Sequence, residues 1–125
     1  MDGSDESGHG TIVASIAAGQ PSNISSYFGV APDSKIAFFD IGDSNGDLYI
    51  PSDLNNELLK PLHNTGATVS SHSWGSTSNS YTVDARSVDK FMWDNPDALV
   101  LMSGKIEMLF AILRLCMTFL IGCVS

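Results

Sequence analysis

Short apolar runs alternate with helix-length patterns between residues 8 and 102, and this alternation constrains the fold more than any other feature of the chain. The runs lie at residues 35–41 (KIAFFDI), 67–71 and 98–102 (ALVLM). The first shows little polar alternation, so we expect a strand that is buried on both faces. Strands joined through helices call for right-handed parallel crossovers, with helices on both faces of the sheet. The sequence therefore predicts an α/β fold of three layers, αβα, with a parallel sheet.

The three helical patterns predict different kinds of packing. Residues 12–19 form a run of small side chains, which predicts a buried, closely packed helix with Gly19 as its C-cap. Residues 52–63 carry leucines at helical spacing, although Pro61 should kink that helix or end it one turn early. Residues 83–93 form an amphipathic pattern, with one face suited to cover the sheet.

Charge divides the chain into two unlike regions, of which residues 1–103 are the body and 104–125 the tail. The body has four Lys or Arg against thirteen Asp or Glu, a net charge of −9, whereas the tail has two against one, a net charge of +1. No basic patch is present, so a nucleic-acid partner is excluded, because neutralising phosphates requires clustered cations. Both cysteines, Cys116 and Cys123, lie in the tail, so no disulfide can form within the body.

His9 is the first candidate for catalysis, because it lies at the start of a predicted helix between two glycines. The positive potential of a helix N-terminus disfavours the imidazolium form and so helps to keep the ring a neutral base. Flanking glycines leave room for a substrate or a partner side chain. A histidine in this position is able to accept a proton from a hydroxyl nucleophile. Taken alone, a histidine between two glycines is also typical of an ordinary helix cap or a solvated loop.

Three motifs in the same order resemble those of the subtilisin-like (S8) serine peptidases. Residues 8–14 (GHGTIVA) match the histidine motif G-H-G-T-x-V-A of that family at every fixed position. Residues 29–32 (GVAP) match the turn before a core strand, and residues 73–75 (SWG) match the substrate-binding S-x-G segment. The resemblance implies that residues 1–103 are part of a peptidase S8 domain with an incomplete subtilisin-like fold.

The same resemblance implies roles for particular residues. His9 corresponds to the general base, and Ser73, Trp74 and Gly75 correspond to the extended segment that pairs with a peptide or protein substrate. For Trp74, a place in the hydrophobic core is an equally good interpretation. No cofactor and no metal site are predicted. The spacing of His63 and His72 suits no metal, and residues 43–47 (DSNGD) are interpreted as an acidic turn and not as a calcium loop.

Two parts of the family pattern are missing from these residues. The catalytic aspartate should lie in a strand well upstream of the histidine, and Asp5 is interpreted as a loop acid beside the motif. The strand at 98–102 runs into Ser103-Gly104-Lys105, without the asparagine that donates to the oxyanion, and no G-T-S-M nucleophile motif follows. We therefore expect the chain to be a fragment of a serine endopeptidase that is inactive alone. The sequence also opens without the basic and apolar pattern of an export signal, so it assigns no compartment.

The tail leaves an alternative open. Residues 108–124 form an apolar run interrupted by Arg114, slightly shorter than the roughly 20 residues that span a bilayer. The run is either membrane-associated or an aggregation-prone end unrelated to the family. The alternative function is accordingly a non-enzymatic remnant, held at a membrane by its tail or binding peptides through residues 73–75. A third possibility is that the chain does not fold stably, because a body of three strands has exposed sheet edges.

Overall fold

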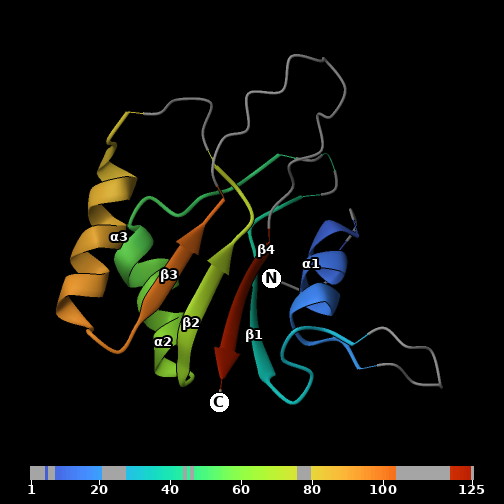
Figure 1. The fold of residues 1–125 in the computed structure, drawn as a ribbon. Helices are drawn as coiled ribbons and strands as arrows, with labels where there is room; N and C mark the ends of the chain where they lie inside the picture. The colour runs from blue at the N-terminus through green and yellow to red at the C-terminus, as the bar shows by residue number, and fades with distance from the viewer. Residues whose placement is uncertain are drawn as a thin grey trace.

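The computed structural model describes residues 5, 8–20, 28–43, 45, 47–75, 80–103 and 119–124, the last as backbone alone. Up to residue 103 the elements follow the predicted order of helix, strand, helix, strand, helix and strand (Figure 1). They are α1 (His9–Ala18), β1 (Lys35–Asp40), the π-helix η1 (Asn55–Leu59) continued by α2 (Lys60–Asn64), β2 (Ala67–His72), α3 (Val83–Asp94) and β3 (Leu99–Met102), and a further strand, β4 (Phe119–Val124), lies in the tail.

The four strands form one sheet in the order β1-β4-β2-β3. Strands β2 and β3 pair in parallel, and β4 pairs antiparallel with both β1 and β2. Because β1 and β2 both oppose β4, the three strands of the body run in the same direction, as predicted. No strand was predicted in the tail. Its insertion between β1 and β2 makes the sheet mixed.

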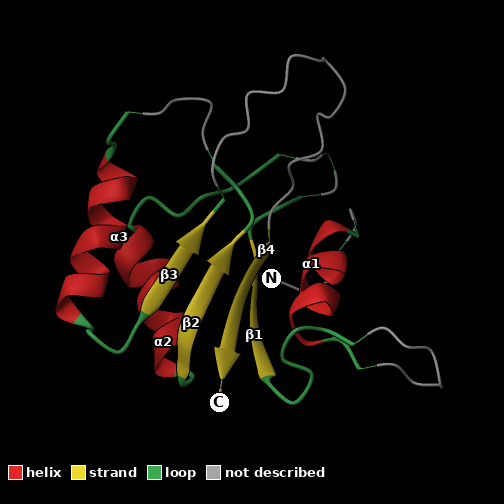
Figure 2. Ribbon diagram, viewed as in Figure 1, coloured by secondary structure: helices red, strands yellow, loops and turns green. Residues whose placement is uncertain are grey.

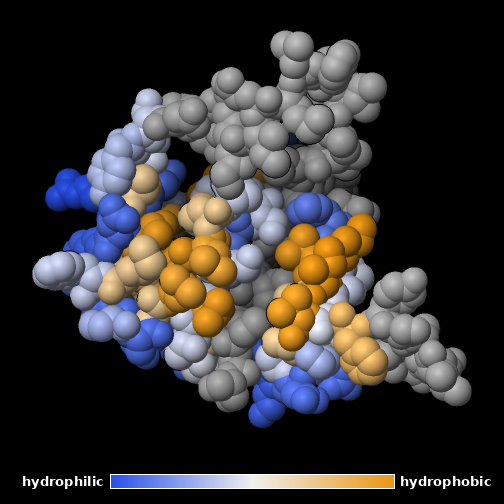
Figure 3. All heavy atoms as spheres, in the orientation of Figure 1, coloured by the Kyte–Doolittle hydropathy of each residue, from blue (hydrophilic) through white to orange (hydrophobic). Residues whose placement is uncertain are grey.

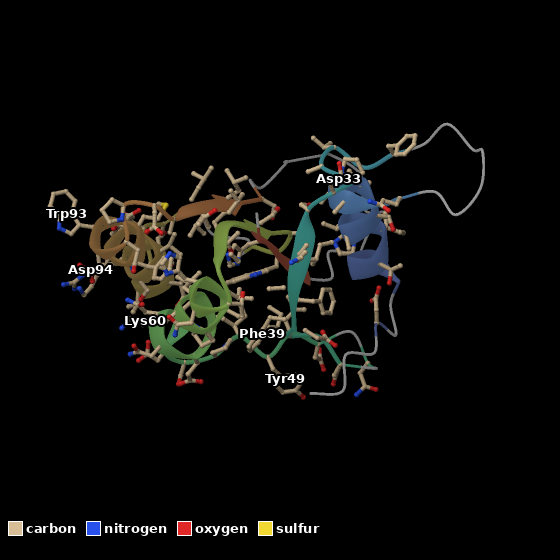
Figure 4. All side chains as sticks on the ribbon, turned by 90° about the horizontal axis from the view of Figure 1, so that it is seen from below. Asp33, Phe39, Tyr49, Lys60, Trp93 and Asp94 are labelled. Carbon is tan, nitrogen blue, oxygen red and sulfur yellow. The ribbon has the colours of Figure 1, made fainter. Side chains whose placement is uncertain are left out.

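Helices cover both faces of the sheet, which confirms the predicted three-layer αβα arrangement (Figure 2). On one face, α2 packs against β1 and β2, and α3 packs against β3 and η1. On the other face, α1 packs against β1 and β4. Figure 4 shows these helices on opposite sides of the sheet, with Trp93 projecting from α3 away from it.

The main hydrophobic core lies between the sheet and the layer formed by η1, α2 and α3. The helical pattern of leucines begins after Asp53, whose carboxylate accepts a hydrogen bond from the backbone N–H of Asn56 (3.0 Å) and so caps the segment. This hydrogen bond lowers the pKa of Asp53. The leucine spacing places one helix face against the sheet. The buried cluster comprises Ile41, Leu54, Leu58, Leu59, Leu62, Trp74, Val88, Phe91 and Val100.

The predicted burial of α1 is wrong, as is the burial of β1 on both faces. Gly10 is the buried residue of α1, and Ile16 keeps 63% of its surface exposed. On β1, Ile36 and Phe38 are 36% and 38% exposed on the face toward α1. The small side chains of the helix, among them Ala14, do not fill the space above the strand, where an open groove of about 650 Å³ remains.

Of the two effects predicted for Pro61, an end of the helix one turn early is wrong. The helical segment does not end early but runs to Asn64. Pro61 falls in the first turn of α2, where the hydrogen-bonding pattern changes from the π-helix η1 to an α-helix. Because a proline has no N–H to donate, it is tolerated best where a new helical register begins. The proline therefore marks a change of register and not the end of the helix.

Candidate active site

His9 is the first residue of α1, and the residues before it are arranged to hold that end of the helix. Gly8 adopts a left-handed conformation with φ of 73°, which suits glycine, although nothing lies within 4 Å of where a Cβ would be. The two carboxylate oxygens of Asp5 accept hydrogen bonds from the backbone N–H groups of Gly8 (2.9 Å) and Thr11 (2.6 Å). Asp5, interpreted from sequence as a loop acid, thus serves as the cap of α1. A carboxylate in this position also complements the positive end of the helix dipole.

The opposite end of α1 is fixed by the G-V-A-P motif. The backbone N–H groups of Gly29, Val30 and Ala31 donate to carbonyls of the helix end, at 2.8, 3.0 and 2.8 Å. The acceptors are Gly19, Ile16 and Ala17, so carbonyls that a helix end leaves without partners are satisfied here. A Cβ at position 29 would lie 2.5 Å from the backbone nitrogen of Gly19, so only glycine permits this approach. Gly19 is the C-cap of α1, as predicted.

These contacts determine at which edge of the sheet His9 lies. The motif that holds the end of α1 is followed, after two residues, by the first residue of β1. The helix therefore runs back along the strand, and its N-terminus lies at the edge where β1, β2 and β3 end (Figure 1). The side chain of His9 is half-buried, and its Nε2 atom is buried. In open α/β sheets, ligands bind outside the carboxyl ends of the strands, which is where this histidine lies.

Residues 73–75 continue β2 at this same edge. The backbone N–H of Ser103 donates to the carbonyl of His72 (2.9 Å), and its hydroxyl donates to the carbonyl of Trp74 (2.9 Å). Ser103 thus ties the end of β3 to the segment after β2. The indole of Trp74 is only 4% exposed and belongs to the core, the second of the two interpretations that the sequence left open. Gly75 is exposed, and a Cβ added there would lie 3.5 Å from the carbonyl oxygen of Ser103.

The predicted site residues therefore come from two separate elements. Ser73, Trp74 and Gly75 are brought together with Ser103 where β2 and β3 end. His9 lies at the same edge of the sheet, at the start of α1, which packs over β1 and β4. Strand β4 separates β1 from β2 in the sheet. The arrangement can present a base and a peptide-pairing backbone at one edge of one sheet.

A buried Ser–His pair was missed by the sequence analysis, which interpreted His72 simply as a strand residue. Ser70 Oγ and His72 Nε2 lie 2.6 Å apart, and the residues are 8% and 1% exposed. Burial lowers the pKa of His72 to about 4, so the ring is neutral near pH 7. The signal was available, because residues i and i+2 of a strand share a face. Being enclosed between the sheet and the helices, the pair contributes to the core and not to the exposed edge.

The remaining predictions concern sites away from this edge. In the acidic turn, the carboxylate of Asp43 accepts hydrogen bonds from the backbone N–H groups of Asn45 and Asp47 (2.9 Å each), which confirms a turn. His63 pairs with Asp97 at 3.1 Å.

Residues 104–118 lie outside the described residues, so most of the apolar run at 108–124 does too. Within the part of the chain that the structure describes, no helix has both the length and the apolar character needed to cross a bilayer.

Comparison with known proteins agrees with the motifs and the fold. The profile of the Subtilase family, peptidase S8, matches residues 1–104. Two proteins of Dictyostelium discoideum, each named "Serine protease/ABC transporter B family protein", are similar to the chain: tagD is 43% identical over 104 residues (75% of this chain), and tagB is 38% identical over 113 residues (83% of this chain). The chain spans only 6% of the length of each relative. No solved structure gives a significant match.

The family profile thus ends within two residues of the last residue of β3, and the three resembling motifs all lie inside it. The described body is a partial serine peptidase-like domain with helices on both faces of its sheet. The predicted resemblance and the predicted fold class are confirmed, and the chain belongs to the subtilase family of peptidases.

Proposed function

We propose that this chain supplies the general base and one peptide-binding edge of a subtilisin-like serine endopeptidase. The observation that carries the proposal is the placement of His9 at the N-terminus of α1, where Asp5 caps one end of the helix and residues 29–31 hold the other. A base must be held in a fixed position to take a proton in the transition state. Hydrogen bonds at both ends of a ten-residue helix provide such a position.

The chemistry follows from the position of the imidazole. A hydroxyl nucleophile beside the ring would give up its proton to His9 as it attacks the carbonyl carbon of a peptide. His9 would pass that proton to the leaving amine as the C–N bond breaks, and water would then hydrolyse the acyl-enzyme that remains. Residues 73–75 would pair with the extended peptide, and the exposed Gly75 permits close approach of its backbone. No residue of the 125 stands in the family's nucleophile motif, so the serine comes from outside them.

The names of these two relatives combine a serine protease with an ABC transporter. The residues of this chain match the subtilase profile, so the proposal concerns peptide-bond hydrolysis alone.

A serine-directed phosphonate probe tests the proposal at two lengths of chain. The purified 125-residue chain should not react, whereas a longer product that contains residues 1–104 should be labelled and should hydrolyse peptides. In that product, His9→Ala should lower kcat by a factor of about 10³ or more. The matched control is His63→Ala, which removes a histidine from the far end of α2 and should leave kcat unchanged. Labelling of the 125-residue chain, or an active His9→Ala product, would refute the proposal.

A further inference from the structure

Two buried rings lie directly beneath the backbone segment that would pair with a substrate. His72 is the last residue of β2 and is 1% exposed, and Trp74, two residues further on, is 4% exposed. Their rings meet edge to face, with the centroids 6.1 Å apart. Resting on the function proposed above, we infer that His72 is a positioning residue for substrate binding, whose imidazole anchors residues 73–75 from inside the core.

The segment at 73–75 is held from two sides. On its backbone side, Ser103 donates to the carbonyls of His72 and Trp74, at 2.9 Å each. On its core side, Nε2 of His72 lies 2.6 Å from Oγ of Ser70, and the ring lies against the indole. Trp74 Nε1 has no hydrogen-bond partner in the described part of the chain, so packing alone holds the indole. Loss of the imidazole from its place would therefore free Trp74 and the backbone on both sides of it.

The anchor requires a neutral ring. A neutral imidazole shares one proton with Ser70 in either tautomer, whereas an imidazolium has two N–H donors. Among the described residues, Nδ1 of His72 is buried without a hydrogen-bond partner. The second proton would therefore place an unpaired charged donor in the core, at a high cost in free energy. Burial accordingly lowers the pKa of His72 to about 4. Acid favours conformations in which the ring leaves the core.

The charged groups around β2 do not offset this cost. The neighbouring strands, LVLM in β3 and FLIGCV in β4, contain no charged residue. On the helical side, Glu57 of η1 and Lys60 of α2 are exposed, and His63 of α2 pairs with Asp97. Burial is the one cause that shifts the pKa of His72. The protonation of His72 itself is therefore the change of charge that this part of the core undergoes on acidification.

Fluorescence of Trp74 tests the anchor in the 125-residue chain, without any need for catalysis. The chain has two tryptophans, and Trp93→Phe removes the other one, which is 85% exposed on α3. Between pH 7 and about pH 5, the emission of Trp74 should move to longer wavelength and its quenching by acrylamide should rise at least about twofold, while the far-ultraviolet circular dichroism stays constant.

Variants at two histidines assign this response. His72→Gln keeps an uncharged polar group beside Ser70 and should abolish the response, whereas His63→Gln should retain it. An emission of Trp74 that changes only together with the circular dichroism would overturn the inference, and this comparison needs no variant at position 72. The same response in His72→Gln would also overturn it.

Peptide hydrolysis tests the consequence for substrate binding, in a longer product that contains residues 1–104. The probe is an uncharged, end-blocked peptide chosen from those that this product hydrolyses. Between pH 7 and about pH 5, protonation of His9 lowers kcat with or without His72→Gln. KM should rise about tenfold in the unmodified product and less than about twofold in His72→Gln, because only the first loses its anchor.

The two measurements distinguish failure of this inference from failure of the proposed function. Equal rises in KM with and without His72→Gln would overturn the role of His72 and leave the peptidase function standing. A longer product that hydrolyses no peptide would overturn the proposed function, and with it the role in substrate binding. The emission of Trp74 would then still decide whether His72 anchors residues 73–75.

Discussion

The two faces of the sheet are covered very differently. On the face of α2 and α3, Leu58 is fully buried and Phe91 is 2% exposed. On the face of α1, Ile12 and Ile16 are 60% and 63% exposed. Figure 3 shows hydrophobic side chains gathered over α1 and, separately, over β3. Burial of apolar area is the main favourable contribution to folding, so the face with α2 and α3 supplies most of the stability and the face with His9 supplies little.

The difference shows that the helices of this protein are held in place in two different ways. The helices η1, α2 and α3 are held by side chains that interdigitate with the sheet. Helix α1 is held mainly at its ends, by Asp5 and by residues 29–31, with a groove left between its small side chains and β1. A helix held by its ends can be positioned well and yet be weakly packed.

The largest expected effect is a contrast between equivalent truncations on the two faces. Leu58→Ala should lower the free energy of unfolding by about 2–5 kcal/mol, because it leaves a cavity in the core. Ile16→Ala should change it by less than about 0.5 kcal/mol, because the side chain is already mostly in water. Urea unfolding followed by circular dichroism measures both. Equal losses from the two substitutions would contradict the comparison, and absence of a cooperative transition in the unmodified chain would show that it does not fold stably.

A second prediction uses the buried His72 on the well-packed face. Its pKa is about 4 in the folded protein against about 6.5 when solvated, because burial opposes the charged form. Between pH 6.5 and pH 4 the unfolded chain therefore binds more protons than the folded protein. The contribution of the buried, neutral His72 to the free energy of unfolding is complete above pH 6.5 and is lost as the pH falls toward 4. The loss should approach roughly 3 kcal/mol, at about 1.4 kcal/mol for each pKa unit.

Urea unfolding at a series of pH values checks this dependence. His72→Gln should flatten the decline between pH 6.5 and 4, even if the variant is less stable at neutral pH. The control is His63→Gln, at the end of α2 and paired with Asp97, which should keep most of the decline. If both variants keep the slope of the unmodified chain, His72 is not the group responsible.

Sequence patterns predicted most of the body, because they report on local geometry. Helical leucine spacing, the glycine at the end of α1 and the strand runs each specify a backbone conformation that the structure adopts. The same patterns could not report what packs against an element. Small residues at 12–19 indicate that a close neighbour is possible, and the space above Ile36 and Phe38 shows that the neighbour is not close.

For the candidate site, the sequence located His9 and residues 73–75 through their motifs, but not the contacts that hold them. Asp5 as a cap depends on a turn that brings it to Gly8 and Thr11. The place of β4 could not be predicted either, because an apolar run without alternation is equally consistent with a strand, a buried helix or a membrane segment. Only the edges of β1 and β2 determine which of these the last six described residues adopt.

Substitutions at the two helix caps should have the smallest effects. They distinguish the opening of one helix from the unfolding of the whole chain. Asp5→Ala removes the carboxylate that accepts from the backbone N–H groups of Gly8, just before α1, and of Thr11 in its first turn. Thr82→Ala removes the hydroxyl that accepts from Ala85 at the start of α3 (3.3 Å). Each cap should contribute about 1 kcal/mol to its helix, equivalent to about a fivefold change in amide hydrogen exchange. Because α3 is part of the core, Thr82→Ala should lower the stability of the whole chain.

Asp5→Ala, in contrast, should accelerate exchange in α1 about fivefold while the urea midpoint hardly moves, since a helix held by its ends can open without the core. Asp5→Asn and Thr82→Ser keep an acceptor oxygen and should restore most of each loss. If Asp5→Ala lowers the urea midpoint as much as Thr82→Ala does, α1 unfolds together with the core. The exposed isoleucines would then be a poor measure of how strongly this helix is coupled to the sheet, and the groove beside β1 would not mark a separately opening unit.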